Sequence, residues 1–472
     1  MKSELTSKEL SFDTDTLPED IFACFSSTSW AMWLDSCNSQ HIDSQFDILV
    51  WDPVSTLSTT GSTTKIVNYV KNTNEQSSED PLSLVNQAVD LTFSHINISE
   101  TLAPPFKGGA VGYFSYDLGR RFEVLPQRCK QDIALAEMSV GIYTKAIIFN
   151  NKTRSFHLIC LAHERKEIEI SLYQQLKQNK QNEQAASFSL HSDWVSNMTP
   201  KEYEQKFNQV HEYLLSGDCY QINLAQRFSA QYSGDEFIAY KTLRKENNAP
   251  FSAFIRLQDT AILSISPERF LRLKGQYVQS KPIKGTRPRH ASEILDLQAA
   301  QELKKSPKDK AENLMIVDLL RNDISKVCEA GSVVVPKLFD IETFPAVHHL
   351  VSTVEGKLSP NYNATDLLRG AFPGGSITGA PKIRAMEIIE ELEPNRRSVY
   401  CGSIGYISAC GNMDTSITIR TLICENNKIH CWAGGGLVAD STLENEYQET
   451  FDKVNKITPV LKKHFSKMVR SS

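Results

Sequence analysis

Several features that would assign a protein to a class at once are missing from this chain of 472 residues. No run reaches the ~18 apolar residues that a membrane span needs. Residues 1–20 lack the basic start and apolar core of a secretory signal. The ten cysteines include no C-x-x-C pair, which argues against a disulfide framework or a zinc site. We therefore expect a soluble, cytoplasmic protein with reduced thiols.

Neither sign of charge is in large excess. Lys and Arg number 51 and Asp and Glu 56, which gives a formal net charge of −5. This balance predicts no binding of nucleic acid or of an anionic membrane surface. The hydrophobic content of 40% and the charged content of 23% are ordinary for a globular protein with a sizeable core. By its length, the chain is expected to be an enzyme with two or three domains.

A polar stretch at residues 176–192, rich in Gln, Asn, Lys and Ser, divides the chain. We expect an N-terminal region at 1–190 and a C-terminal region at 195–465. Another polar stretch, 55–78, is expected to be a long loop or a ragged sheet edge. Strands are expected at 46–51, 109–115, 146–149, 252–257, 261–266, 270–273, 402–408 and 415–422, and helices at 82–89, 199–216, 308–320, 383–392 and 443–465. This order predicts an α/β (α+β) fold with a largely antiparallel sheet.

Lys284 is the first candidate for chemistry. It lies in Ser280-Lys-Pro-Ile-Lys-Gly-Thr-Arg-Pro-Arg289, where an expected strand ends just before a glycine. The like charges of Lys281, Arg287 and Arg289 would lower the pKa of its ammonium group and leave more free amine to act as a nucleophile. The alternative is a basic surface loop, and this segment alone does not decide between the two.

Four carboxylates are the next candidates. Glu268 stands between two expected strands, and Glu312 is near the start of an apolar helix. Glu446 and Glu449 are three residues apart, so their carboxylates share one helix face. Since Mg²⁺ is usually held by one or two carboxylates while it keeps water and substrate oxygens, Glu312 and Glu449 could bind it from separate helices. Solvent-exposed helix faces are the alternative interpretation.

Two glycine-rich segments and one arginine could bind an anion. Residues 372–382 precede an expected helix, and Gly434-Gly-Gly436 ends an expected strand, so both could present backbone N–H groups to a ligand. Plain turns are the alternative. Arg420 is expected in the middle of a strand, where a substrate carboxylate or a structural salt bridge would be its partner. Of the pair His348 and His349, one is expected to be structural or a substrate contact.

Eight stretches together resemble the chorismate-utilising enzymes, which include anthranilate, isochorismate, salicylate and aminodeoxychorismate synthases. They occur in the order of that family and span about 199–461. The stretches are Ser266-Pro-Glu268, Pro282-Ile-Lys-Gly-Thr286, 312–323, His349-Leu-Val-Ser352, Gly379-Ala-Pro-Lys382, 414–420, Gly434-Gly-Gly436 and 446–450. Lysine at position 284 is typical of the aminodeoxychorismate synthase branch, whereas the anthranilate and isochorismate synthases carry alanine there.

The resemblance implies two antiparallel sheets packed face to face with helices outside. It also implies amination of chorismate at C4 to give 4-amino-4-deoxychorismate, for 4-aminobenzoate and folate synthesis. Lys284 would be the covalent nucleophile and Glu268 the general acid. Mg²⁺ would be held by Glu312, Glu449 and Glu446. The residues implied to bind the substrate are Tyr400, Arg420, Gly434, Gly435, Gly436, Lys382, Ser376 and His349.

The resemblance implies partners as well. No cysteine lies in a Gly-x-Cys-x-Gly segment, so ammonia is expected from a separate glutamine amidotransferase subunit in a heterodimer, and the overall reaction would be an aminotransferase reaction that converts L-glutamine to L-glutamate. The segments 29–36 and 44–47 resemble the start of the same branch, where the family has a tryptophan pocket. Its implied residues here are Ser36, Asp43, Ser44, Gln45, Phe46, Pro250, Phe251 and Ser252. The alternatives are an anthranilate or isochorismate synthase, or a non-catalytic protein that binds chorismate or tryptophan.

Overall fold

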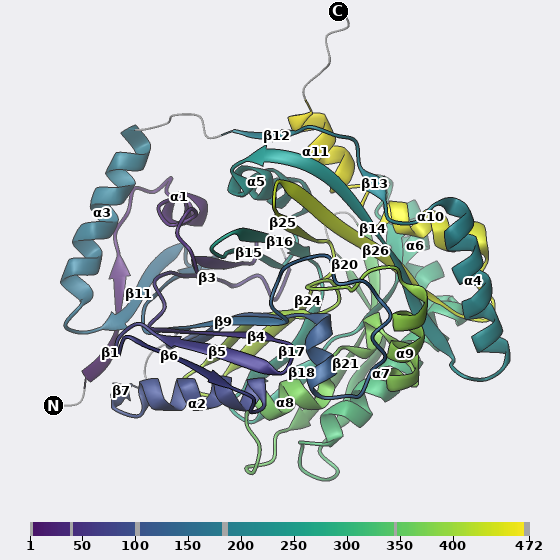
Figure 1. Ribbon diagram of the computed structural model, residues 1–472, viewed down its shortest axis with the longest axis horizontal. Coiled ribbons are helices and arrows are strands. Elements are labelled where there is room, and N and C mark those ends of the chain that lie inside the picture. Colours follow the sequence, from purple (N-terminus) through teal and green to yellow (C-terminus); the bar gives the residue numbers. More distant parts are fainter. Residues whose placement is uncertain (1–2, 38–40, 100–103, 182–186, 344–346, 467–472) are drawn as a thin grey trace, which may run out of the picture.

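Two large sheets form the frame of the molecule (Figure 1). The computed structural model describes all residues except 1–2, 38–40, 100–103, 182–186, 344–346 and 467–472. Within the described part, a sheet of 14 strands (sheet A) and a sheet of 12 strands (sheet B) are present, and β1 with β7 is the one parallel pairing between their strands. The predicted mixed α/β fold with two largely antiparallel sheets is confirmed.

Sheet A draws its strands from the whole length of the chain. It consists of β1 (Ser3–Leu10), β2 (Met32–Asp35), β3 (Phe46–Val50), β7 (Ile96–Ile98), β10 (Ala146–Asn150), β11 (Ser155–Leu161), β12 (Phe188–Leu190), β13 (Val195–Ser196), β14 (Gln221–Gly234), β15 (Phe251–Arg256), β16 (Thr260–Ser266), β22 (Gly379–Ala380), β25 (Thr421–Glu425) and β26 (Lys428–Leu437). The pairing of β15 with β2 joins the two halves of the sequence in one sheet.

Sheet B is mixed in the same way. It consists of β4 (Ser55–Thr60), β5 (Thr63–Asn68), β6 (Thr73–Ser77), β8 (Gly109–Phe114), β9 (Met138–Tyr143), β17 (Arg269–Lys274), β18 (Tyr277–Ser280), β19 (Ile283–Pro288), β20 (Val334–Thr343), β21 (Val347–Lys357), β23 (Ser403–Ser408) and β24 (Met413–Ile417). Here β23 pairs with β8. Because both regions contribute strands to both sheets, the boundary between 1–190 and 195–465 stays a prediction.

Helices cover the outer faces of the two sheets (Figure 1). They are α1 (Pro18–Ala23), α2 (Pro81–Phe93), α3 (Arg165–Gln181), α4 (Pro200–Leu215), α5 (Glu236–Asn247), α6 (Glu293–Lys305), α7 (Pro307–Ser325), α8 (Ala364–Ala371), α9 (Lys382–Leu392), α10 (Leu443–Asp452) and α11 (Thr458–Phe465), with short 3₁₀ turns η1 (Tyr116–Arg121) and η2 (Gly375–Ile377). None of the described helices is long and apolar enough to cross a membrane.

Successive side chains of a strand point to opposite faces of the sheet, and the apolar ones form two clusters on the two faces of sheet A. On β2, Met32 belongs to the cluster between the sheets, together with Val111 of β8. Its neighbour Trp33 points to the other face of sheet A and packs with Phe22 of α1 and Tyr240 of α5. The sheets therefore pack face to face, as the resemblance implied.

The single strand predicted at 415–422 is wrong, because this stretch contributes to two strands in different sheets. β24 ends at Ile417 in sheet B, and β25 begins at Thr421 in sheet A, so the chain crosses between the sheets. Arg420 stands at this crossing with a φ of 52°, a left-handed conformation that side chains other than Gly rarely adopt. It is therefore a residue of the crossover and not of a strand interior.

Three other expected elements differ from the structure. The polar stretch 55–78 forms the regular strands β4, β5 and β6 at one edge of sheet B. The single helix expected at 443–465 is two helices, α10 and α11, separated by residues 453–457, and Pro459 stands in the first turn of the second. The dividing stretch 176–192 begins inside α3 and includes β12, which pairs with β14, while 182–186 lie outside the described residues.

Candidate active site

Glu268 and Lys284 meet where two strands of sheet B begin. Glu268 directly precedes β17, and Lys284 is the second residue of β19. The backbone N–H of Ile283 and the Ser376 hydroxyl, 3.2 Å from Oε1, both donate to the Glu268 carboxylate. Burial raises the pKa of Glu268 to about 7, although Lys284 acts to lower it. A carboxyl group with this pKa can hold and release a proton near neutral pH, which suits a general acid.

Lys284 is a buried amine whose pKa lies below the usual range. Burial is the main cause, and the Lys453 ammonium lowers the pKa further, whereas Glu312 raises it. The sequence-based explanation through the basic neighbours is wrong, because Lys281 and Arg287 are ion-paired with Glu342 and Asp309. Arg289 likewise pairs with Asp296. The direction of the shift agrees with the expectation and its cause does not.

Glu446 and Glu449 lie against the glycine strand β26. A Cβ added to Gly435 would stand 2.7 Å from Glu446 Oε2 and 3.5 Å from Glu449 Oε1. The Ser441 hydroxyl donates to Glu446 Oε1 at 2.6 Å, but Glu446 Oε2 is buried without a hydrogen-bond partner among the described residues. Only glycine at 435 leaves room for both carboxylates.

Glu312 faces the same cluster from α7. Burial raises its pKa, and the charged groups that act on it include Lys284 and Glu449. Burial also raises the pKa of Glu446, on which Glu449 acts in the same direction. Burial acts to raise the pKa of Glu449 as well, but Lys453, Lys284 and Lys308 together hold it below its usual range. The structure thus brings together the three carboxylates that the sequence predicted.

Two lysines of this cluster were missed in the sequence. The Lys453 ammonium bonds Glu449 Oε1 and the Gly434 carbonyl, each at 2.6 Å. Lys308 lies 4.0 Å from Glu312 Oε1. Both pairs have i,i+4 spacing, which is the signal that could have found them.

A magnesium ion fits this cluster if protein carboxylates supply some of its ligands and the substrate supplies others. No group of three or more His, Cys, Asp or Glu in the described residues is arranged to hold a metal. The unpartnered Glu446 Oε2 and the carboxylates of Glu449 and Glu312 nevertheless supply the oxygen ligands that Mg²⁺ prefers. The donor set therefore fits a cation that takes one or two protein carboxylates and completes its shell with water and substrate oxygens.

Arg420 is a buried cation beside Glu268 and has no ion pair with the residues that the structure describes. Burial lowers the pKa of its guanidinium, and Glu268 is the charged group that acts against this. No hydrogen bond or ion pair of this guanidinium is found within the described chain. His349 bonds the Thr286 hydroxyl through Nδ1 at 2.9 Å, and burial together with Arg420 lowers its pKa to about 4, so it is neutral near pH 7. Both residues can meet an anionic or polar substrate.

The remaining predicted substrate contacts are divided. Ser376 bonds Glu268, Gly435 adjoins Glu446 and Glu449, and the Gly434 carbonyl accepts from Lys453, so these lie at the site. Gly436 lies against Gln221. Tyr400 is buried and stacks on Trp432, with ring centroids 6.1 Å apart. Lys382 is not brought to the cluster, since its ammonium bonds Asp323 at 2.5 Å and the Ala371 carbonyl at 2.8 Å. The assignment of these residues to substrate binding stays a prediction.

Gln221 is a further residue that the sequence did not single out. It opens β14 and is fully buried, and neither its amide nitrogen nor its amide oxygen has a hydrogen-bond partner among the described residues. Its Nε2 lies 2.8 Å from where a Cβ on Gly436 would stand. A buried amide without partners is costly unless something bonds it. β14 carries two further glutamines, Gln226 and Gln231, so the residue type alone does not distinguish Gln221 in the sequence, and only the structure reveals it.

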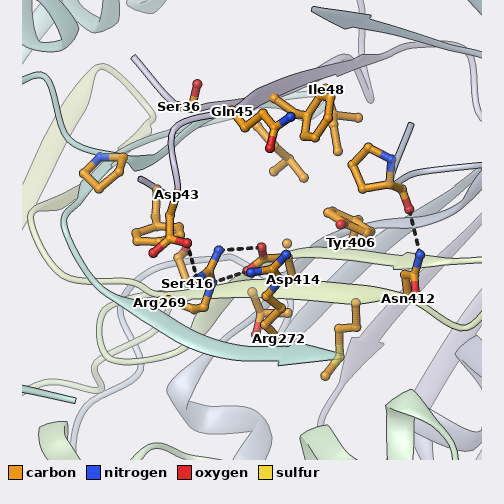
Figure 2. Close-up of a pocket in the computed structure, with 18 of the residues that line it drawn as sticks. Ser36, Asp43, Gln45, Ile48, Arg269, Arg272, Tyr406, Asn412, Asp414 and Ser416 are labelled. Atoms are coloured by element: carbon orange, nitrogen blue, oxygen red, sulfur yellow. Dashed lines mark hydrogen bonds and ion pairs between the residues drawn. The ribbon is translucent and has the colours of Figure 1, made fainter. Parts of the chain in front are cut away.

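A separate cavity of about 520 Å³ opens between the sheets (Figure 2). Its lining contains seven of the eight residues predicted for a tryptophan pocket, namely Ser36, Asp43, Gln45, Phe46, Pro250, Phe251 and Ser252. Ser44 is buried but does not line it. Figure 2 shows Asp43, Arg269 and Asp414 joined by ion pairs at one wall. The structure therefore gathers these residues around one space, and its occupant stays a prediction.

The site combines a buried amine, a carboxyl group that can carry a proton, three carboxylates and an arginine without an ion pair among the described residues. This set suits an enzyme that acts on a small, multiply charged anion. Comparison with known proteins agrees: the chain belongs to the chorismate-binding enzyme family, which it matches over residues 30–459.

Its relatives include aminodeoxychorismate synthase component 1 of Escherichia coli (strain K12), 54% identical over 445 residues that cover 94% of this chain and 96% of the relative. The same protein of Klebsiella aerogenes is 53% identical over 447 residues, covering 93% of this chain and 95% of the relative. Among solved structures, anthranilate synthase component I from Streptococcus pneumoniae TIGR4 superposes with a TM-score of 0.77 at 33% identity, covering 89% of this chain and 93% of that one.

Proposed function

We propose that this chain aminates chorismate at C4 to give 4-amino-4-deoxychorismate, the reaction for which its relatives in Escherichia coli and Klebsiella aerogenes are named. The observation that carries the proposal is the buried Lys284 amine beside Glu268, a carboxyl group whose pKa is raised to about 7. The two residues supply a nucleophile and an acid at one place, which is what displacement of a hydroxyl group requires.

Chorismate carries two carboxylates, and the site offers two places for them. Arg420, which has no bonded partner within the described residues, meets one carboxylate together with the backbone N–H groups of the strand Gly434–Gly436. The ring carboxylate faces Glu312 and Glu449. Bound Mg²⁺, held by these two residues and Glu446, would supply charge neutralisation and orientation there. The partnerless amide of Gln221 adds a donor and an acceptor at the Gly436 end.

The first chemical step uses Lys284 and Glu268. The lone pair of Lys284 Nζ forms a bond to C2 of the ring, the C1=C2 double bond shifts to C1=C6, the C5=C6 double bond shifts to C4=C5, and the C4–O bond breaks. Glu268 gives its proton to the departing oxygen, so the hydroxyl group leaves as water. Ser376 and the Ile283 N–H hold the Glu268 carboxylate that remains. Hydroxide is a poor leaving group, and the raised pKa of Glu268 keeps a proton available for it near pH 7.

The second step reverses the displacement with ammonia. Ammonia bonds C4, both ring double bonds shift back to C5=C6 and C1=C2, and the C2–N bond to Lys284 breaks, so the amine is released. The chain carries no Gly-x-Cys-x-Gly segment that could hydrolyse glutamine. We therefore propose that a glutamine amidotransferase supplies the ammonia as a second subunit. The name component 1 of the relatives supports this proposal.

The decisive experiment incubates the purified chain with chorismate, magnesium chloride and ammonium at mildly alkaline pH and identifies the products by mass and fluorescence. The expected product is 4-amino-4-deoxychorismate, or 4-aminobenzoate once the lyase is added. Fluorescent anthranilate would instead identify an anthranilate synthase. No consumption of chorismate, even with an added amidotransferase, would favour a binding protein.

For the cavity of Figure 2 we propose L-tryptophan as the occupant. The pocket combines apolar rings, Phe46 and Phe251, with ion-paired charges that could meet an ammonium and a carboxylate group. Calorimetric titration with L-tryptophan tests this proposal, with L-leucine as the comparison. Equal or absent binding of both amino acids would refute it.

A further inference from the structure

Asp43 forms ion pairs with two basic residues, each of which stands close in sequence to a residue of the active site. Its Oδ1 lies 2.9 Å from Arg269 Nη1, and its Oδ2 lies 3.7 Å from Lys281 Nζ. Arg269 directly follows Glu268, and Lys281 comes three residues before Lys284. One carboxylate of the connection between β2 and β3 therefore reaches both strands that carry the proposed chemistry.

Glu268 and Arg269 point to opposite faces of sheet B. Neighbouring residues of an extended chain point to opposite sides, so Glu268 faces the active site while Arg269 faces the cavity of Figure 2. On the active-site side, the Ile283 N–H donates to the Glu268 carboxylate. On the cavity side, Asp43 joins Arg269 to Lys281. The segments that lead into β17 and β19 are thus linked by a hydrogen bond on the active-site face and through the ion pairs of Asp43 on the cavity face.

Further contacts make this ion-pair network rigid. Arg269 makes two hydrogen bonds to Asp414 of β24, at 2.9 and 3.0 Å. Lys281 also pairs with Glu342 of β20 at 2.5 Å. The Arg269 side chain is 4% exposed and that of Asp43 is 11% exposed, so neither charge is screened as a surface pair would be. Removing the Asp43 carboxylate would leave Arg269 with one carboxylate partner and Lys281 with another, and the two strands would lose their common anchor.

We propose that Asp43 is a positioning residue of the active site, which fixes the separation of Glu268 and Lys284 by holding Arg269 and Lys281 together from the opposite face. This inference rests on the proposed function of those two residues. Asp43 does not touch the reacting atoms. Its effect arises because a displacement of about 1 Å between reacting groups can cost on the order of 100-fold in rate.

The test compares Asp43→Asn, Asp43→Glu and a matched control. Asp43→Asn is expected to lower kcat for ammonium-dependent amination by about tenfold or more and to change KM for chorismate less than about twofold, since the substrate contacts stay in place. Asp43→Glu keeps the charge and should restore most of kcat. The control is Asp52→Asn, which removes an exposed ion pair with Lys145 at a position whose φ of 46° asparagine tolerates.

A second arm does not depend on turnover. Hydrogen exchange of the substrate-free chain should be faster in Asp43→Asn in peptides that cover 266–274 and 281–288, with unchanged exchange in β5. Should the wild type fail to aminate chorismate, the proposed function fails, and the exchange arm alone decides whether Asp43 holds these strands. Unchanged kcat in Asp43→Asn overturns the proposal, and so does faster exchange throughout the protein, which would indicate general destabilisation. Additive losses of kcat on combining Asp43→Asn with Lys281→Met would also overturn it, because members of one network are not independent.

Discussion

Gly435 offers the sharpest test of the carboxylate cluster. An added Cβ would stand 2.7 Å from Glu446 Oε2, and ordinary contact begins near 3.4 Å, so the carboxylate must retreat by 3.4 − 2.7 = 0.7 Å. Its other oxygen is bonded to Ser441 at 2.6 Å, which limits where it can go. The backbone at 435 does not have a positive φ, so alanine is tolerated by the strand itself. Gly435→Ala therefore displaces the cluster with little effect on the fold.

We expect Gly435→Ala to weaken Mg²⁺ binding by about tenfold, equivalent to about 1.4 kcal/mol. The free energy of unfolding should change by less than about 1 kcal/mol, because the gain from replacing glycine offsets part of the strain. Calorimetric titration with magnesium chloride and the magnesium dependence of chorismate consumption measure the effect. Gly370→Ala in α8 is the control, since the nearest atom to its Cβ is 3.5 Å away. An unchanged affinity for magnesium in Gly435→Ala would refute a cation site at Glu446 and Glu449.

Three further variants test the individual groups. Lys284→Met should lower kcat by about 1,000-fold or more, since it removes the nucleophile while circular dichroism stays unchanged, and normal turnover would exclude the covalent step. The wild-type kcat/KM should fall by about tenfold per pH unit above about 7, as Glu268 loses the proton it donates. In Glu268→Gln this falling limb should vanish from the residual activity, and its persistence would mean that another group is the acid. Arg420→Met should raise KM for chorismate by about 10- to 100-fold, as expected for a lost charge-assisted bond of 1.5–3 kcal/mol, and should not lower the melting temperature.

Local signals predicted much of the fold. Thr199 was expected to start a helix, and its hydroxyl and Glu202 form a reciprocal capping box at the start of α4. The strands β15, β16 and β17 appear within a residue or so of their expected limits. For the stretch 55–78 the sheet-edge alternative agrees with the structure and the loop alternative does not. Its polarity suggested a loop, although the threonines of β4 and β5 favour strands.

Elements that depend on distant contacts could not be predicted. A run such as 415–422 contains no mark that its first half joins sheet B and its second half sheet A, because that choice is made by strands far away in sequence. The residues of the site likewise include some that could be predicted from local sequence and some that could not. Lys284 and Glu268 stand in segments with a recognisable pattern, whereas Lys453 and Gln221 gain their importance from contacts with β26. The reactive residues can therefore be found from their type and their local sequence. The residues that contact them in space are known only from the fold.

Arg420 shows how the crossover between the sheets serves the site. A left-handed φ on a residue other than glycine costs on the order of 1–3 kcal/mol and persists only where the surroundings impose it. Here β24 and β25 impose it, since the chain must leave one sheet and enter the other within three residues. The guanidinium placed there is buried, and its burial lowers its pKa. Within the described residues it has no ion pair that would offset the free-energy cost of burying this charge. We therefore expect an anionic substrate to pair with this guanidinium, so that part of the free energy of binding would arise from the partner that Arg420 lacks among the described residues.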